Sequence, residues 1–218
     1  SALFCSRFAD KAAARAKFAR YQQLLRGTDV VGIQEAHGHP GDLSTLTREA
    51  PTRHHFGSFT NSPAAGGIII SLCNFFVDTI SSIEQVVIAP GWCLALRCCG
   101  PLGNNQFINI HIEPALSHKE KVALLHKIAA AAKTFDGITY IFGDFNFVPS
   151  DEARFNISEC RDAPGDTKLA FAFEAIFDDF TELHQPGYTR KQVAHDRISS
   201  LSRLDRIYTN IHRTTRTT

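Results

Sequence analysis

Hydrophobic residues recur at helical spacing in three stretches of the chain. Residues 8–26 carry apolar side chains on one face and basic side chains on the other. Residues 117–133 repeat the pattern, and Ser117 and Glu120 have the spacing of a capping box. Residues 169–183 form the third, strongly apolar stretch. We predict a helix over each of them.

Shorter apolar runs, separated by turns rich in glycine and proline, predict strands. These runs cover residues 29–36, 66–73, 77–89, 92–99, 105–113 and 138–145, with a last strand at about 201–209. The polar residues 151–168 are typical of a loop. Because strands outnumber helices, the order favours two packed sheets flanked by helices over one doubly wound parallel sheet. With no repeat and no linker-like segment, we interpret residues 1–218 as one domain.

Composition narrows the possible functions only slightly. Hydrophobic residues make up 44% of the chain, which allows a sizeable core, and the net charge of +1 gives no general attraction to polyanions. None of the six cysteines forms a Cys-x-x-Cys pair, and the adjacent Cys98 and Cys99 would point to opposite faces of a strand. A zinc site is therefore not expected. No stretch has the length of a membrane span, and no signal peptide is visible.

Positive charge gathers locally toward the C-terminus. From residue 184 onward only Asp196 and Asp205 oppose seven basic residues, which are Arg190, Lys191, Arg197, Arg203, Arg206, Arg213 and Arg216. Such a segment can follow a nucleic-acid backbone. A solvated tail with a chance excess of arginine has the same composition, so both interpretations stay open.

Polar side chains occur at the ends of three predicted strands. Glu35 ends one, Asp144 and Asn146 end another, and Asp205 lies in the last. Strand alternation would put Asp144 and Asn146 on one side, where both could face a single bound group. Carboxylate and amide oxygens form a hard-ligand set suited to Mg²⁺. A lone acidic residue after a strand is more often a cap or a solvated loop residue, so the prediction depends on the combination.

His111 is a further candidate. It lies in "FINIHIEP" at the end of an apolar strand, just before Glu113 and Pro114. An imidazole there could donate a hydrogen bond to a phosphate oxygen in a transition state. A histidine inside an apolar strand is as often a core residue with a backbone partner.

Taken together, these blocks resemble the endonuclease/exonuclease/phosphatase (DNase I-like) superfamily. The blocks are "IQE" with Glu35, "INIHIEP" with His111, "GDFN" with Asp144 and Asn146, and "SRLDRIY" with Asp205, supported by "AGGIII" and "GYTR". Their order and spacing extend over nearly the whole chain. They are most similar to apurinic endonucleases and to the endonuclease domains of non-LTR retrotransposons. The resemblance implies a four-layer α/β sandwich of two mainly antiparallel sheets flanked by helices.

The resemblance also implies roles for these residues. Glu35 matches the metal-binding glutamate, and Asp144 and Asn146 match residues that hold the metal, the attacking water and the phosphate. His111 takes the position of a residue that contacts the phosphate, and Asp205 matches the aspartate that orients a general histidine. The expected cofactor is Mg²⁺ or Mn²⁺, and the expected activity is endonucleolytic cleavage of DNA by an intracellular, nuclear protein.

Two pieces of the family pattern are not found. An asparagine on the first strand would precede Ser1, and a Ser-Asp-His block would follow Asp205 on a further strand. We therefore expect a domain truncated at both ends, with impaired activity. Two alternatives stay open, namely a phosphatase of the same fold acting on inositol phosphates or lipid headgroups, and a non-catalytic remnant. Oligomeric state cannot be predicted from these features.

Overall fold

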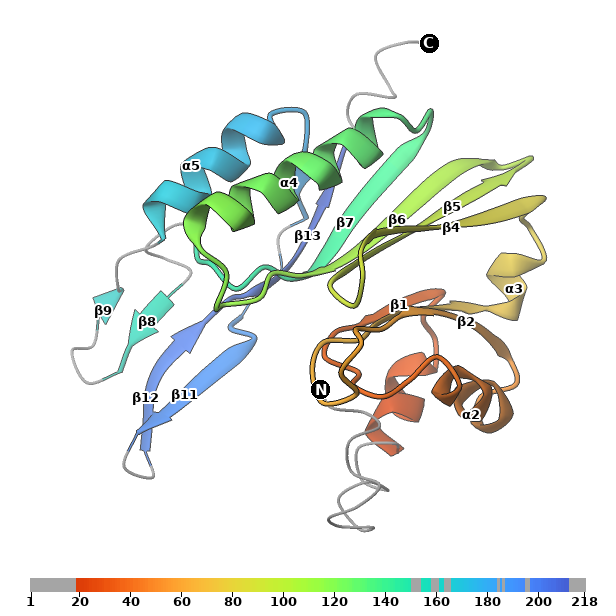
Figure 1. Ribbon diagram of the computed structural model, residues 1–218, viewed down its shortest axis with the longest axis horizontal. Coiled ribbons are helices and arrows are strands. Elements are labelled where there is room, and N and C mark those ends of the chain that lie inside the picture. Colours follow the sequence, from red (N-terminus) through yellow and green to blue (C-terminus); the bar gives the residue numbers. More distant parts are fainter. Residues whose placement is uncertain are drawn as a thin grey trace.

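Three β-sheets form the scaffold of the protein (Figure 1). The computed structural model describes residues 19–149, 154–157, 161–162, 166–183, 185, 187–194 and 197–211. Within these residues, the sheets have six, three and four strands.

The six-stranded sheet occupies the centre. Its strand order is β10 (Thr181–Glu182), β13 (Asp205–Thr209), β7 (Ile138–Asp144), β6 (Gly103–His111), β5 (Cys93–Gly100) and β4 (Ser82–Ala89). Neighbouring strands are antiparallel except β6 and β7, which are parallel because helix α4 (His118–Lys133) crosses between them. Two of the strands that carry candidate residues therefore end at the same edge of the sheet.

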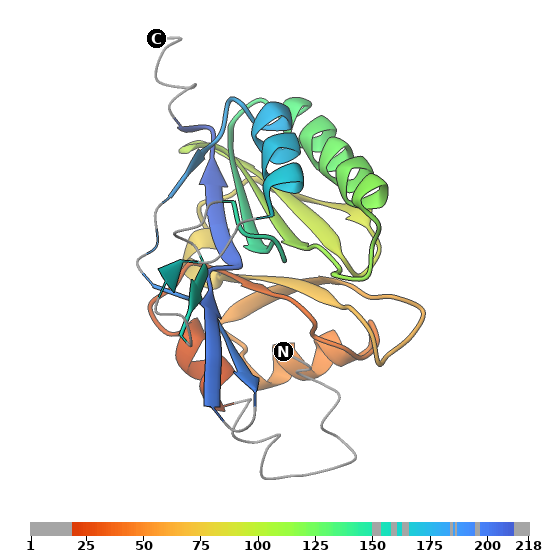
Figure 2. The same ribbon diagram turned by 90° about the vertical axis from the view of Figure 1, so that its left-hand side faces the viewer.

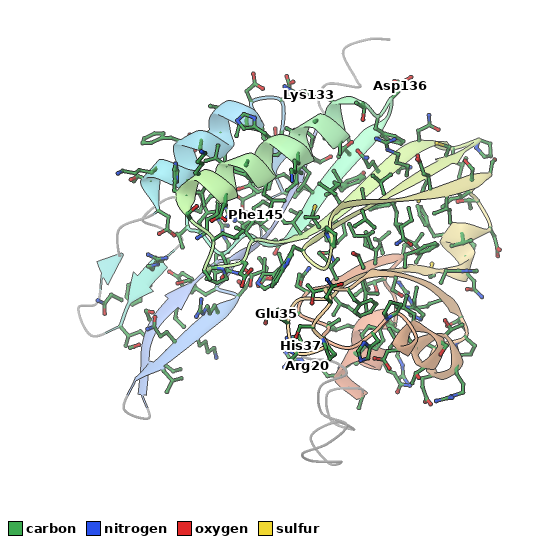
Figure 3. All side chains as sticks on the ribbon, in the orientation of Figure 1. Arg20, Glu35, His37, Lys133, Asp136 and Phe145 are labelled. Atoms are coloured by element: carbon green, nitrogen blue, oxygen red, sulfur yellow. The ribbon has the colours of Figure 1, made fainter. Side chains whose placement is uncertain are left out.

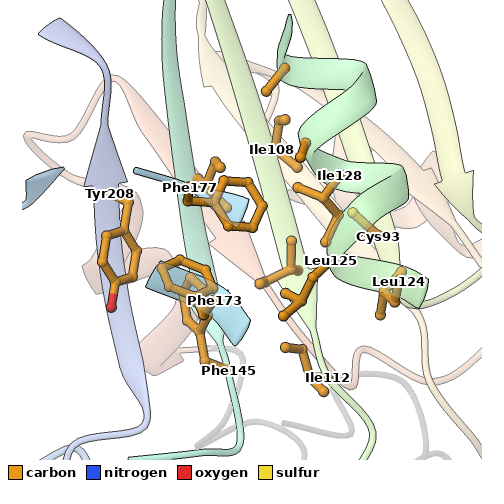
Figure 4. Packing of buried hydrophobic residues seen from close by; sticks show 14 of the residues in the cluster. Cys93, Ile108, Ile112, Leu124, Leu125, Ile128, Phe145, Phe173, Phe177 and Tyr208 are labelled. Atoms are coloured by element: carbon orange, nitrogen blue, oxygen red, sulfur yellow. The ribbon is translucent and has the colours of Figure 1, made fainter. Parts of the chain in front are cut away.

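Helices α4 and α5 (Thr167–Ile176) cover one face of this sheet (Figure 1). Figure 4 shows Leu125 and Ile128 of α4 and Phe173 of α5 facing the buried side chains of the strands. Phe145, Phe173 and Tyr208 contact one another, with ring centroids 4.7–5.6 Å apart. This aromatic cluster lies directly beneath the loop that follows β7, and so gives that loop a rigid base.

The three-stranded sheet packs on the other face. Its order is β1 (Val30–Ile33), β3 (Ile68–Cys73) and β2 (Arg53–Ser58), all antiparallel. Ile68, Ile70 and Leu72 of β3 pack against the six-stranded sheet, while Ile69 packs with α2 (Asp42–Glu49) and the helical segment 19–25. Since β3 is buried on both faces, its sequence is a continuous apolar run. The short helix α3 (Asn74–Val77) follows it.

Figure 2 shows the resulting layers, with helices on the two outer sides and the two sheets between them. The predicted four-layer sandwich of two mainly antiparallel sheets is confirmed. The third sheet has the order β11 (Arg190–Ala194), β12 (Arg197–Ser202), β8 (Arg154–Asn156) and β9 (Arg161–Asp162), and projects beside the sandwich (Figure 1). This sheet was not predicted.

Local predictions differ in outcome. The capping box at Ser117 and Glu120 is present, and α4 ends at Lys133 as predicted. The helix expected over 169–183 is wrong at its end, because α5 stops at Ile176 and Thr181–Glu182 pair with β13. Residues 154–156 and 161–162 form strands inside the expected loop. Residues 8–18 of the first predicted helix lie outside the described residues.

The expected last strand is in fact two strands. β12 belongs to the four-stranded sheet and β13 to the six-stranded sheet, with Arg203 and Leu204 between them. No helix among the described residues is both long and apolar enough to cross a bilayer.

Candidate active site

Strand register brings three candidate residues to one edge of the six-stranded sheet. His111, the last residue of β6, pairs with Asp144, the last residue of β7. Asp144 also pairs with Asp205, the first residue of β13. The three residues therefore lie on adjacent strands at the same level, although they are far apart in sequence.

Glu35 reaches this group from the three-stranded sheet. It lies two residues beyond β1 and has a left-handed backbone, with φ of 49°, which is uncommon for a residue other than glycine. Its side chain is half exposed, and its Oε1 lies 3.9 Å from Nε2 of His111. Glu35 and His111 therefore face each other across the junction of the two packed sheets.

The end of β7 depends on Gly143, its second-to-last residue. Gly143 has φ of 133°, and a Cβ atom on it would collide with the carbonyl oxygen of Ile110. Only glycine fits both conditions, so the sequence Gly-Asp fixes the level at which Asp144 leaves the sheet. Asn146 has φ of 49°, and its backbone N–H donates to Oδ1 of Asp144 at 2.9 Å. This bond holds the carboxylate in one orientation.

The alternation expected for Asp144 and Asn146 is not observed. β7 ends at Asp144, and the left-handed backbone of Asn146 breaks the extended pattern. Asn146 lines a different cavity from Asp144. The two residues are joined by the hydrogen bond from the backbone N–H of Asn146 to the carboxylate of Asp144.

Three carboxylates share one cavity. Glu35, Asp144 and Asp205 line a cavity of about 470 Å³, together with Arg20, Tyr21, Leu24, Val31, Gly32, Ile33 and Gln34. In Figure 3, Glu35 and Arg20 lie on the side of the three-stranded sheet, whereas Lys133 and Asp136 lie at the far side of the six-stranded sheet, where α4 ends. Of the five candidate residues, Glu35, Asp144 and Asp205 therefore line this cavity, whereas His111 and Asn146 do not.

The surroundings of this cavity shift the pKa of Asp144. Burial raises the pKa of its carboxyl, and the negative charges of Asp205 and Glu35 raise it further. The N–H of Asn146 and the neighbouring His111 act in the opposite direction, and the net effect is a raised pKa. Deprotonated Asp144 is thus a carboxylate held at a cost in free energy, which a nearby cation would reduce.

His111 is fixed mainly by packing. Its side chain is 3% exposed, and its ring lies 5.4 Å from the ring of Trp92. Its backbone N–H donates to the carbonyl of Trp92 at 2.8 Å. Within the described residues Nδ1 has no hydrogen-bond partner, and Nε2 faces Glu35. The ring is thus held beside Trp92, which lies in the turn between β4 and β5, and Nε2 is directed at Glu35.

Asn109 was not singled out from the sequence. It is fully buried on β6, and its Nδ2 donates to the carbonyls of Ile33 and Ile69 at 3.1 and 2.9 Å. Its Oδ1 accepts from Nε2 of Gln34 at 2.5 Å. Asn109 therefore joins the two sheets immediately before Glu35. The signal was available, because Asn109 and His111 are alternate polar residues in an otherwise apolar strand.

The basic C-terminal segment needs a correction. Arg206 is 1% exposed, and Arg203 pairs with Glu182 at 3.4 Å, so neither is placed to follow a nucleic-acid backbone. Arg190 and Lys191 are exposed on β11. Arg213 and Arg216 lie outside the described residues, as does the side chain of Arg197.

Arg206 instead supports the loop after β7. Its guanidinium lies 4.5 Å from the ring centroid of Phe145 and 4.3 Å from that of Phe147. It donates to the carbonyl of Phe147 and to Oη of Tyr208, both at 2.9 Å. Because Phe145 and Phe147 flank Asn146, the buried cation fixes the loop on both sides of that residue.

The donor atoms of the site decide which metal ion it could bind. In the described part of the chain, no group of three or more His, Cys, Asp or Glu side chains is arranged as a complete metal site. Mg²⁺ does not require one, since it commonly binds one or two carboxylates and keeps several waters. The carboxylates of Glu35 and Asp144 are consistent with that kind of binding.

Comparison with known proteins gives a family match. Residues 5–217 match the model of the endonuclease/exonuclease/phosphatase family. Among curated proteins, no sequence matches the chain. Solved structures do match it at low identity, which shows a shared fold.

Three of these structures illustrate the range of proteins that match the fold. TDP2 of D. rerio, complexed with a single-stranded DNA product, is 17% identical with a TM-score of 0.61, over 93% of this chain and 78% of that one. An AP endonuclease from Archaeoglobus fulgidus is 13% identical with a TM-score of 0.63, over 89% and 79%. The endonuclease domain of TRAS1, a telomere-specific non-LTR retrotransposon, is 10% identical with a TM-score of 0.52, over 77% of each chain.

Members of the matched family are hydrolases that act on phosphoester bonds. The family match covers nearly the whole sequence, and the carboxylates that the motifs singled out meet in one cavity of the matching fold. The chain therefore belongs to the endonuclease/exonuclease/phosphatase family.

Proposed function

We propose that this protein is a metal-dependent phosphodiesterase that cleaves DNA, with Glu35, His111, Asp144, Asn146 and Asp205 at its active site. The observation that carries the proposal is the shared cavity of Glu35, Asp144 and Asp205. Three carboxylates at the ends of packed strands repel one another, and such an arrangement is typical of a functional site rather than a structural one.

The residues fit a divalent cation by two criteria. Their donor atoms are carboxylate oxygens, which Mg²⁺ and Mn²⁺ prefer. The pKa of Asp144 is raised by burial and by two neighbouring carboxylates, and a cation would counter that effect. Glu35 and Asp144 would hold the ion, which when bound supplies positive charge for the phosphoryl oxygens.

Each protein group then has a chemical role. Asp144, oriented by the N–H of Asn146, positions a water molecule and accepts its proton. His111 is held with Nε2 at the site, where it donates to a phosphoryl oxygen as negative charge develops. Asp205 lies beside Asp144 and keeps the site negative. The amide of Asn146 donates to the substrate from the neighbouring cavity.

Strain in the backbone supports this assignment. Among described residues other than glycine, positive φ angles occur at Glu35, His37 and Asn146. Two of these three are proposed site residues, and the third is two positions from Glu35. Backbone strain of this kind persists where the surrounding structure enforces it, and it concentrates at active sites.

The choice of DNA rests on the fold neighbours. One neighbour is described as bound to a single-stranded DNA product, one as an AP endonuclease and one as a retrotransposon endonuclease domain. We carry this chemistry over as part of the proposal, including a retroelement-type role for the single domain. A phosphatase acting on a small phosphomonoester would use the same carboxylates, and so must be tested directly.

Two assays run in parallel distinguish these substrates. The first measures nicking of supercoiled plasmid with Mg²⁺ or with EDTA, and the second measures phosphate released from inositol phosphates. Asp144→Asn removes the proposed base with little change in size. Asp178→Asn is the matched control, because Asp178 lines a cavity formed by the other ends of α4 and α5.

We expect the wild type to nick plasmid in the presence of Mg²⁺. The rate should fall by a factor of at least about 100 in Asp144→Asn, as is common when a general base is removed. It should persist in Asp178→Asn. Phosphate release without nicking would replace DNA with a small phosphomonoester as the substrate. Nicking at equal rates in both variants would remove Asp144 from the mechanism.

A further inference from the structure

A second cavity adjoins the loop after β7. It measures about 400 Å³ and is lined by Asn146 and Phe147, by the first turns of α4 and α5, and by Asp166. The lining residues from the helices are His118, Lys121, Thr167, Lys168 and Leu169. None of these residues lines the cavity that contains Glu35, Asp144 and Asp205.

The two helices run in the same direction toward the opposite end of the sheet. Both begin at this cavity, and the last residues of both, Lys133 and Ile176, line another cavity with Asp178. Figure 1 shows them side by side on one face of the six-stranded sheet. The positive ends of both helix dipoles are therefore directed at the second cavity.

Two lysine side chains add to this positive potential. Lys121 and Lys168 come from two different helices and line the same space, together with His118. Nζ of Lys121 donates to the carbonyl of Pro114 at 3.0 Å, and because an ammonium has three donors it retains capacity for a ligand. The cavity thus combines the charges of Lys121 and Lys168 with the polar residue Asn146.

Two acidic residues lie nearby, and each is engaged within the protein. Oδ2 of Asp166 accepts from the N–H of Val148 at 2.8 Å and from Nη2 of Arg154 at 3.2 Å. Glu120 caps α4, with Oε2 2.8 Å from the backbone nitrogen of Ser117. Arg154 balances the charge of Asp166, so the cavity keeps an excess of positive charge.

Asn146 connects this cavity to the proposed active site. Its backbone N–H donates to Asp144, and the residue also lines the second cavity. An anion held by Lys121 and Lys168 would therefore lie beside a residue that is hydrogen-bonded to the carboxylate proposed to act on the scissile bond. A strand of DNA carries phosphates at regular intervals, whereas a phosphomonoester substrate can carry a single one.

We infer that this cavity is a second phosphate subsite, which binds a non-scissile phosphate of a polynucleotide whose neighbouring phosphodiester lies at Asp144. The inference rests on the proposed function for its substrate class. It adds that the protein recognises a strand with several phosphates, through Lys121, Lys168 and the amide of Asn146.

Binding can be tested without turnover. Fluorescence anisotropy with a labelled single-stranded 12-mer, in EDTA, gives the dissociation constant at several salt concentrations. The test variant is Lys121→Gln/Lys168→Gln, and the control is Lys127→Gln/Lys133→Gln, which removes the same charge from α4 outside the cavity. Calorimetric titration with inorganic phosphate measures the affinity for a free anion.

We expect the test variant to bind the 12-mer about tenfold more weakly at 0.1 M salt, with a salt slope reduced by about one to two, and the control to bind as the wild type does. Equal binding by the two variants, or no binding by the wild type, would overturn the subsite. Inorganic phosphate that binds as tightly as the 12-mer would overturn the polynucleotide assignment. This assay measures binding and no cleavage, so its result is independent of hydrolysis. A protein that binds as expected here but does not cleave DNA would refute the proposed hydrolysis and leave the subsite standing.

Discussion

Arg206 offers a quantitative test of how the proposed site is supported. Arg206→Met removes the guanidinium and keeps most of the aliphatic stem. The variant loses two hydrogen bonds, to the Phe147 carbonyl and to Tyr208, and two ring contacts at 4.5 and 4.3 Å. Hydrogen bonds to charged groups contribute about 1.5–3 kcal/mol each, and desolvated cation–π contacts about 2 kcal/mol each.

Burying the cation opposes these gains, because its desolvation costs several kcal/mol. We therefore expect a net loss of about 2–4 kcal/mol in the free energy of unfolding, and a Tm lower by about 5–15 °C for a domain of this size. Urea unfolding followed by circular dichroism gives the first value and a thermal scan gives the second.

The control is Arg48→Met. The side chain of Arg48 is 72% exposed and, among the described residues, pairs only with the neighbouring Glu49, at 3.6 Å, so its loss should cost about 1 kcal/mol or less. If the two variants were destabilised equally, the buried guanidinium of Arg206 would have no special role in holding the loop.

Three further outcomes are expected. Asp144→Asn should raise Tm in EDTA at pH 7. A carboxyl with a raised pKa stabilises the fold below its ordinary pKa of about 3.9, and it loses that contribution as pH rises through the raised value. A lower Tm at pH 7 would contradict this. Burial, and then the charge of Arg53, lower the pKa of His55 to about 4, so between pH 6.5 and 4 only the unfolded chain gains the proton. His55→Gln should therefore flatten the fall in stability over that pH range. An unchanged pH profile of stability in urea unfolding would argue against it. Asn109→Leu should cost about 2–4 kcal/mol by leaving the carbonyls of Ile33 and Ile69 without their donor, and a loss below 1 kcal/mol in urea unfolding would show that the link between the sheets is weak.

The elements that the sequence predicts best are those whose local pattern and tertiary environment agree. β3 is buried on both faces and is an unbroken apolar run, and α4 starts at a capping box with an amphipathic repeat behind it. β2, with the sequence Arg-His-His-Phe-Gly-Ser, gives no such signal. It is a strand because β3 pairs with its whole length.

The end of α5 shows the same competition. The residues after Ile176 remain apolar, yet Phe177 turns into the core and Thr181–Glu182 pair with β13. The periodicity of a sequence cannot indicate where a strand distant in sequence will pair with a segment. For the same reason the expected last strand was not separated into β12 and β13, which belong to different sheets.

For the site, the motifs predicted five residues around one space, and the structure brings only part of that set into one cavity. Glu35, Asp144 and Asp205 line it, whereas His111 and Asn146 do not. Asn146 could not be placed by alternation, because its left-handed backbone lies beyond the end of β7. Arg206 could not be distinguished from Arg203 by composition, and only the fold shows that Phe145 and Phe147 enclose it.

The central claim is that Glu35 and Asp144 hold one cation at a single hydrolytic centre. Calorimetric titration of Mg²⁺ into the wild type, Glu35→Gln and the control Glu84→Gln, whose glutamate lies on β4, tests it most directly. We expect one Mg²⁺ site in the wild type and in the control, and an affinity at least about tenfold weaker in Glu35→Gln, as the loss of a carboxylate ligand predicts. Equal Mg²⁺ affinity in all three proteins would contradict the claim.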